Sequence, residues 1–132
     1  DAKGRTIIPA KYREGLGETF IITRGLDGCL YLYPSDAWQE FADKLQSLPS
    51  TLQNRKIQRQ FLSKAMEVSL DKQGRILVPA LHREMADLEK DVIFVGMMNR
   101  VELWDKARYN TEETEEDEEL LASAMDTLDI SL

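Results

Sequence analysis

Two segments of the chain carry the same short motif, in which an aspartate is followed, after two residues, by glycine and arginine. The first reads Asp1-Ala2-Lys3-Gly4-Arg5 and the second Asp71-Lys72-Gln73-Gly74-Arg75. In such a turn the carboxylate can accept backbone amides, and the glycine supplies a positive φ without a steric penalty. The carboxylate can also fix the arginine through a bidentate pair. We therefore predict two turns that each present one arginine and are shaped by Asp1, Gly4, Asp71 and Gly74.

Basic side chains surround both turns. The first turn contains Lys3 and Arg5, the second contains Lys72 and Arg75, and the segments that follow add Lys11, Arg13 and Arg83. A two-stranded tip can enter a major groove of ~12 Å, where an arginine held by a carboxylate suits the O6 and N7 atoms of guanine. Lysines beside it can bind phosphates. These seven residues are the predicted contacts with double-stranded DNA, although turn chemistry alone favours a purely structural turn.

No combination of residues favours catalysis. The single cysteine, Cys29, and the single histidine, His82, cannot by themselves form an internal disulfide, a metal site or a catalytic dyad. The carboxylate pairs Asp1 with Glu14 and Asp71 with Glu84 lack a nucleophile and have pairing partners in Arg75 and Arg83. We predict no enzyme activity, no metal, no cofactor and no small-molecule substrate, and we expect His82 at a half-exposed helical position.

Two other groups of side chains could contact nucleic acid. Arg55, Lys56 and Arg59 form a basic patch that is more typical of a solvated helix face, and we leave them out of the site. Five aromatic residues could stack on bases, as in single-strand binders, but their positions on strands and helix faces favour the core or subunit packing. They are Tyr31, Tyr33, Trp38, Phe41 and Trp104.

The elements that carry the turns occur twice. Residues 1–14, DAKGRTIIPAKYRE, align without a gap to residues 71–84, DKQGRILVPALHRE. Each copy predicts a short strand, a helix begun by a proline (Pro9 or Pro79) and a hairpin of two buried strands. The predicted strands include Thr6–Ile8, Phe20–Thr23, Ile76–Val78 and Val92–Val95, with hairpin turns at Asp27-Gly28 and Asn99-Arg100. Alternation over residues 66–70 predicts one more strand, whose first-copy equivalent is expected to precede Asp1.

Helices are predicted between the two copies and after the second copy. Helical spacing predicts one helix capped by Ser35 and ended by Pro49. A second helix capped by Thr51 and a third from Asp105 on are also predicted. Seven of the eight residues from Glu112 to Glu119 are acidic, which predicts a frayed or disordered segment. The predicted organisation is a first repeat at 1–50, a connecting helix at 51–64, a second repeat at 65–109 and an acidic tail at 110–132. Because a half of about 50 residues buries little surface, the halves are expected to complete each other's sheet, and subunits to do the same.

Charge is divided unevenly along the chain. The formal net charge is −7, but all 17 basic residues precede Asn110 and nine of the 24 acidic residues follow it. A mildly basic body with an acidic tail is compatible with DNA binding. The tail is typical of a solubilising extension; as an alternative, it competes with phosphates for Arg5 or Arg75. Without a long apolar run or a leader, the sequence predicts a cytoplasmic, nucleoid-associated protein outside membranes.

In the two turn motifs and the segments around them, the sequence resembles the MraZ family, whose members carry two Asp-x-x-x-Arg motifs. The resemblance covers Asp1 to about Arg108 and includes DAKGRTIIPAKYRE, TRGLDGCLYLYP, SDAW, DKQGRILVP and VELWD. It implies an α+β fold of two tandem AbrB-like swapped-hairpin β-barrel halves with flanking helices. It also implies ring-shaped homo-oligomers that bind direct repeats in the promoter of the division and cell-wall gene cluster that contains their own gene, as repressors. Arg5 is the DNA contact implied most directly, followed by Arg75.

Two other interpretations stay open. An antitoxin of the AbrB type would use the residues after Arg108 to neutralise a toxin partner. A structural ring would assemble through strand edges without binding DNA. The acidic tail is no part of the motif pattern of the family.

Overall fold

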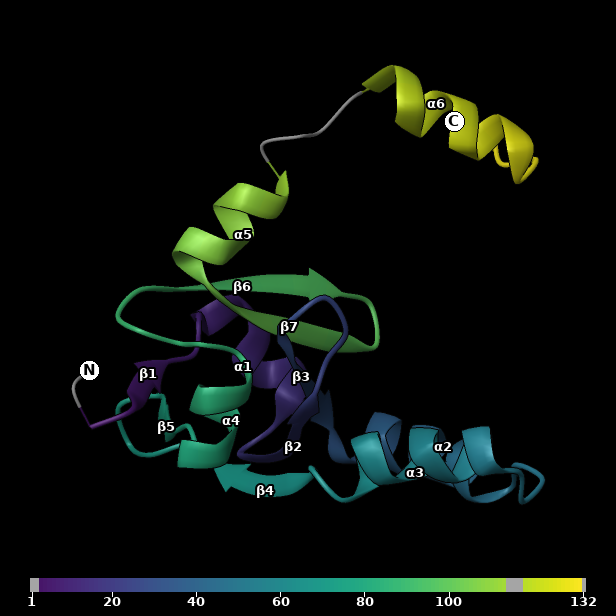
Figure 1. Ribbon diagram of the computed structural model, residues 1–132. Helices are drawn as coiled ribbons and strands as arrows, with labels where there is room; N and C mark the ends of the chain where they lie inside the picture. The colour runs from purple at the N-terminus through teal and green to yellow at the C-terminus, as the bar shows by residue number, and fades with distance from the viewer. Residues whose placement is uncertain (1–2, 114–117, 132) are drawn as a thin grey trace.

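The computed structural model describes residues 3–113 and 118–131 and combines strands and helices in an α+β fold (Figure 1). The first copy comprises β1 (Arg5–Ile7), α1 (Ala10–Leu16), β2 (Thr19–Arg24) and β3 (Leu30–Pro34). Helices α2 (Ser35–Gln46) and α3 (Leu52–Leu62) lead to β4 (Met66–Ser69). The second copy comprises β5 (Arg75–Leu77), α4 (Ala80–Met85), β6 (Val92–Met97) and β7 (Arg100–Asp105), followed by α5 (Lys106–Glu113) and α6 (Glu118–Thr127). Each copy has the predicted order of strand, helix and hairpin.

Strands from both copies build one five-stranded antiparallel sheet. Its order is β4-β2-β3-β7-β6, so the hairpins β2–β3 and β6–β7 meet where β3 pairs with β7. At this junction Leu30 lies opposite Leu103 and Leu32 opposite Val101. Backbone pairing therefore joins the two copies, which confirms the prediction that the halves complete each other's sheet.

A second, two-stranded sheet, which we call the ribbon, contains the strands that follow the two turns. β1 and β5 lie side by side at the N-terminal edge of the molecule (Figure 1) and pair antiparallel, with Thr6 opposite Ile76. Two further backbone hydrogen bonds extend the pairing, because Ile8 N–H donates to the Gly74 carbonyl and Val78 N–H to the Gly4 carbonyl, each at 2.9 Å. The ribbon thus forms only when segments 70 residues apart come together.

Two hydrophobic clusters support these sheets. The main cluster contains Ile8 and Ile76, which anchor the ribbon, together with sheet residues such as Phe20, Leu32 and Leu103. The second cluster is aromatic and is built on Tyr31, Tyr33 and Trp104, with Trp38 and Phe41 packed against it. The Tyr33 and Phe41 rings stack with centroids 5.4 Å apart. The prediction that these five aromatic residues serve packing is confirmed.

The second hairpin differs from its prediction in two respects. It turns at Met98 and Asn99, and Arg100 is already the first residue of β7. The prediction of a buried strand at Val92–Val95 is wrong, because β6 is half-buried. The physical reason is its place at the edge of the sheet, where β7 is its neighbour and the other edge of the strand is uncovered by the sheet.

The helix boundaries differ in part from the predicted ones. Pro34, with an extended backbone at ψ 154°, precedes α2 in place of the predicted cap Ser35, and α2 ends at Gln46, before Pro49. Thr51 caps α3 as predicted, since its hydroxyl accepts the Asn54 amide. The helices α5 and α6 reach into the acidic segment from both sides, and residues 114–117 of that segment lie outside the described residues. In the described ranges, no helix combines the length and apolar character that crossing a membrane requires.

Candidate nucleic-acid interface

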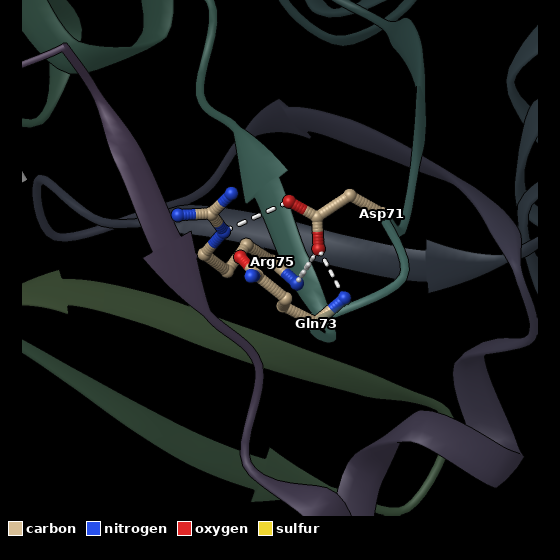
Figure 2. Close-up of polar contacts among 3 residues, drawn as sticks. All are labelled: Asp71, Gln73 and Arg75. Atoms are coloured by element: carbon tan, nitrogen blue, oxygen red, sulfur yellow. Dashed lines mark hydrogen bonds and ion pairs between the residues drawn. The ribbon is translucent and has the colours of Figure 1, made fainter.

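The second turn is held together by the Asp71 carboxylate (Figure 2). Its Oδ1 accepts the backbone amides of Gln73 at 2.8 Å and Arg75 at 2.9 Å, and its Oδ2 accepts Arg75 Nε at 2.8 Å. Gly74 adopts a φ of 76°, the left-handed region that glycine enters without strain. The bond from the Arg75 amide, above all, holds the pKa of the Asp71 carboxyl below its ordinary value. The carboxylate and the glycine of this turn thus have the geometry that the sequence predicts, but the predicted bidentate pair is wrong, because Asp71 contacts Arg75 through Nε alone. The role of Arg75 as a DNA contact stays a prediction.

The Asp71–Arg75 pair engages one guanidinium nitrogen, Nε, rather than two. The contact lies partly in solvent, with the Arg75 side chain 31% exposed and the Asp71 side chain 39% exposed. Because Nε is the inner nitrogen of the guanidinium, the two terminal nitrogens lie outside this pair. These two nitrogens can donate together to guanine O6 and N7.

The first turn is described from Lys3 onward. Gly4 has a φ of 85°, which matches Gly74, and both Lys3 and Arg5 are exposed. Asp1 lies outside the described residues, so its predicted role in shaping this turn stays a prediction. The backbone of Gly4 nevertheless repeats the conformation of Gly74, as expected for two copies of one motif.

The register of the ribbon brings Arg5 and Arg75 to one face. Arg5 lies opposite Leu77 and Arg75 opposite Ile7, and alternate residues of a strand point to the same side. The opposite face carries Thr6 and the buried Ile76. From the spacing of antiparallel strands, the Cα atoms of the two arginines lie about 8 Å apart on the diagonal.

Two apolar residues complete the outer face of the ribbon. Ile7 is 59% exposed and Leu77 is 56% exposed, although both are β-strand residues of the kind that usually enter a core. Sequence reasoning assigned them to strands without recognising that they share a face with the arginines. The signal was available, since each lies two residues after its arginine and the strand period is two.

The lysines predicted as phosphate contacts fall into two groups. Lys3 and Lys72 belong to the turns and are exposed. Lys11 is exposed on α1, where its Nζ lies 5.1 Å from the centre of the Tyr12 ring, and it lines a hollow beside the β6–β7 hairpin. The structure thus gathers Lys3 and Lys72 with the ribbon and places Lys11 beside a different hairpin.

Arg13 and Arg83 occupy equivalent places behind the turns. Arg13 Nε donates to the Ile8 carbonyl at 2.7 Å, and Arg83 Nε donates to the Val78 carbonyl at 3.0 Å. Both side chains are half-buried. Each guanidinium lies against a turn glycine: a Cβ on Gly74 would come within 2.7 Å of Arg13 Nε, and a Cβ on Gly4 within 2.7 Å of Arg83 Nε.

The reactive side chains outside the ribbon are buried. Cys29 is 3% exposed, and burial raises the pKa of its thiol to about 12, which leaves a poor nucleophile. His82 is fully buried, so the predicted half-exposed position is wrong; α4 turns its ring inward, where Nε2 donates to the Lys64 carbonyl at 2.6 Å. Among the described residues, no cluster of three or more His, Cys, Asp or Glu could hold a metal ion.

The comparison with known proteins agrees with the internal repeat. A family model described as "MraZ protein, putative antitoxin-like" matches the chain twice, at residues 1–60 and 61–130. A Transcriptional regulator MraZ from a Thermoanaerobacter species is 49% identical over 133 aligned positions, which cover 98% of this chain and 93% of the relative. The protein of that name from Acetivibrio thermocellus is 54% identical over 112 positions, covering 84% and 78%. The one from Lachnoclostridium phytofermentans is 48% identical over 111 positions, covering 84% and 79%. Matches of this identity and extent show that the chain belongs to the MraZ family.

Proposed function

We propose that this protein is a sequence-specific transcriptional regulator that binds double-stranded DNA through the ribbon and acts as a repressor. The observation that carries the proposal is the β1–β5 register, which aligns Arg5 and Arg75 on one exposed face. The name shared by the relatives, Transcriptional regulator MraZ, supports the same function. The proposal assigns no catalytic step to the chain.

In this proposal the outer face of the ribbon enters the major groove. A two-stranded ribbon fits the groove, and the terminal nitrogens of Arg5 and Arg75 donate to guanine edges. Ile7 and Leu77 lie beside them, where apolar groups can contact thymine methyls. Lys3, Lys72 and Lys11 bind phosphates, and each phosphate contact contributes ~0.9 to the slope of log affinity against log salt concentration.

Oligomerisation supplies the remaining specificity. The swapped-hairpin halves assemble into a ring of identical subunits that presents several ribbons to one side of DNA. Direct repeats spaced by about one helical turn of 10 to 10.5 bp then engage neighbouring subunits, and weak single contacts add through effective concentration. The natural target is a promoter with such repeats, that of the division and cell-wall gene cluster containing the protein's own gene. The protein then works in the cytoplasm, at the nucleoid.

The Arg5→Ala variant tests the site. We expect its affinity for a duplex with the promoter repeats to fall by at least about tenfold, because one bidentate base contact is lost from every subunit. Arg55→Ala, which removes an exposed arginine of α3, is the matched control and should bind as the wild type does. Circular dichroism and oligomer size should be unchanged in both. Wild-type affinity in Arg5→Ala, or equal binding of repeat and random duplexes by the wild type, would overturn the proposal.

A second candidate function is that of an antitoxin with a protein partner. It is favoured by the description of the matching family as antitoxin-like and by α6, whose Leu120 is 69% exposed and Leu121 is 53% exposed. A defined toxin that binds the full chain and is released by truncation after Arg108 would support this function. If neither DNA nor a toxin binds while the ring assembles, a purely structural role is the remaining interpretation.

A further inference from the structure

The two copies place an arginine at the same point of their helices. Arg13 lies in α1 and Arg83 in α4, at an offset of 70 residues. Each arginine donates through Nε to the backbone carbonyl of the residue just after the ribbon strand of its own copy. This residue is Ile8 in the first copy and Val78 in the second. A charge-assisted bond to a half-buried carbonyl restricts the orientation of each guanidinium.

The residues that accept these bonds belong to the pairing between the copies. Ile8 N–H donates to the carbonyl of Gly74, in the second turn, and Val78 N–H donates to the carbonyl of Gly4, in the first turn. The guanidinium of Arg13 accordingly covers Gly74, and that of Arg83 covers Gly4. The contacts are crossed, because each arginine supports the turn of the other copy.

We infer that Arg13 and Arg83 are positioning residues that hold the DNA-reading arginine of the opposite copy, Arg75 and Arg5 respectively, and that they do not themselves bind DNA. This inference rests on the proposed function and replaces the sequence-based expectation that both contact DNA. The flat guanidinium lies where a side chain on the glycine would have to be, so it packs directly on the turn backbone. Arg75 N and Nε are bound by Asp71 within the same turn, so a shift of Gly74 displaces Arg75 as well.

A double-mutant cycle in DNA affinity tests the crossing. Arg13→Ala should weaken binding to the repeat duplex, and adding it to Arg75→Ala should cause no further loss beyond about twofold, since both changes disable the second turn. Adding Arg13→Ala to Arg5→Ala should multiply the two losses, because these changes disable different turns. Arg83→Ala should show the mirror pattern, with no further loss on Arg5→Ala and a multiplied loss on Arg75→Ala.

Arg13→Lys separates positioning from phosphate binding. A lysine at a phosphate contact would restore most of the affinity, whereas an ammonium cannot reproduce the Nε bond and the flat contact with Gly74. We expect Arg13→Lys to bind as weakly as Arg13→Ala, with a wild-type salt slope on random duplex. Lys11→Ala is the matched control and should lower that slope by ~0.9. Rescue by lysine, or a multiplied loss of Arg13→Ala with Arg75→Ala, would overturn the inference.

A readout without DNA keeps the inference testable if the proposed function fails. The Nε–Hε signal of Arg75 in a proton–nitrogen spectrum should shift in Arg13→Lys and stay in place in Arg83→Lys. The signal of Arg5 should respond in the reverse order. If Arg5→Ala and Arg75→Ala keep full DNA affinity, the proposed function fails alone; if the signals respond to the arginine of their own copy, the inference fails alone.

Discussion

At the scale of single residues, the second turn contains a modest contact to which the proposed function gives a role in recognition. The Asp71–Arg75 pair is partly exposed, and an ion pair of this kind adds little to the free energy of unfolding. In the proposed function, the pair restricts the guanidinium before DNA binds, so that less conformational entropy is lost on binding. The aspartate is therefore expected to affect affinity more than stability.

Asp71→Asn tests this expectation. The remaining side-chain oxygen can still accept the Gln73 and Arg75 amides, but an amide donor then faces Arg75 Nε in place of the Oδ2 acceptor. We expect the affinity for repeat DNA to fall about fivefold, with the thermal midpoint nearly unchanged. Fluorescence anisotropy and a thermal melt measure the two quantities.

Asp36→Asn is a suitable control for the Asp71 change. Asp36 is an exposed carboxylate at the start of α2, and its Oδ1 accepts the Ala37 amide. The Asp36→Asn change removes one negative charge, as Asp71→Asn does, but at a distance from the ribbon. It should therefore leave DNA affinity unchanged. A loss of thermal stability in Asp71→Asn with unaltered affinity would assign the aspartate to the fold instead of the site.

At the scale of elements, local chemistry could be read from the sequence and pairing between distant segments could not. Asp71, Gly74 and Arg75 lie within five residues, so the contacts of the carboxylate with the turn amides and with Arg75 followed from turn geometry, although the pair is made through Nε alone and is not bidentate. The Thr51 cap is likewise local. The pairing of β1 with β5 joins three-residue strands whose sequences do not indicate which strand they pair with. The crossed contacts of Arg13 and Arg83 therefore could not be predicted from the sequence.

His82 shows the same limit for a helix. Its position in α4 follows from the sequence, but its burial depends on the connection between α3 and β4, which supplies the Lys64 carbonyl. A carbonyl can only accept, so Nε2 carries the proton of the neutral ring. Among the described residues, Nδ1 has no hydrogen-bond partner, and a second proton there would be buried without compensation. Burial accordingly lowers the pKa of His82.

This burial predicts a dependence of stability on pH. With a folded-state pKa below the ordinary 6.5, His82 leaves stability intact above about pH 6.5 and reduces it as the pH falls from there toward the folded-state pKa. We expect the free energy of unfolding of the wild type to decline as the pH falls from about 6.5 to 5.5, by at most ~1.4 kcal/mol per pH unit from this group. Urea unfolding at fixed protein concentration measures the decline.

His82→Gln is the variant that isolates the histidine. Its amide can donate to the Lys64 carbonyl and does not titrate, and His82 is the single histidine of the chain. The decline should therefore be smaller in the variant than in the wild type. Equal declines in the two proteins would mean that other groups set the pH dependence and that His82 is protonated without penalty.

At the scale of the whole molecule, the charges are separated along the chain. The ribbon and its neighbours carry the proposed DNA contacts, while the residues after Asn110 contain nine acidic residues and no basic one. Leu120 and Leu121 of α6 are exposed, so α6 does not bury these two side chains against the rest of the described residues. An acidic segment tethered to this body raises the local concentration of negative charge near the basic turns, which are the proposed DNA contacts.

Removal of residues 114–132 tests whether the tail competes with DNA. The truncation takes away seven acidic residues and no basic one, which changes the formal net charge from −7 to 0. We expect tighter binding to repeat DNA and a steeper salt dependence, because the competition is strongest when salt does not screen it, over a Debye length of ~10 Å at 0.1 M. Affinity measured over a series of salt concentrations gives both quantities.

A full-length variant with the seven carboxylates of residues 114–132 changed to amides separates charge from chain length. If electrostatic competition is the cause, this variant should bind as tightly as the truncated chain, since each has lost the same seven charges. If the tail acts by occluding the ribbon sterically, the truncation alone should tighten binding. Unchanged affinity in both would remove the tail from DNA recognition and leave α6, with its exposed leucines, to a protein partner.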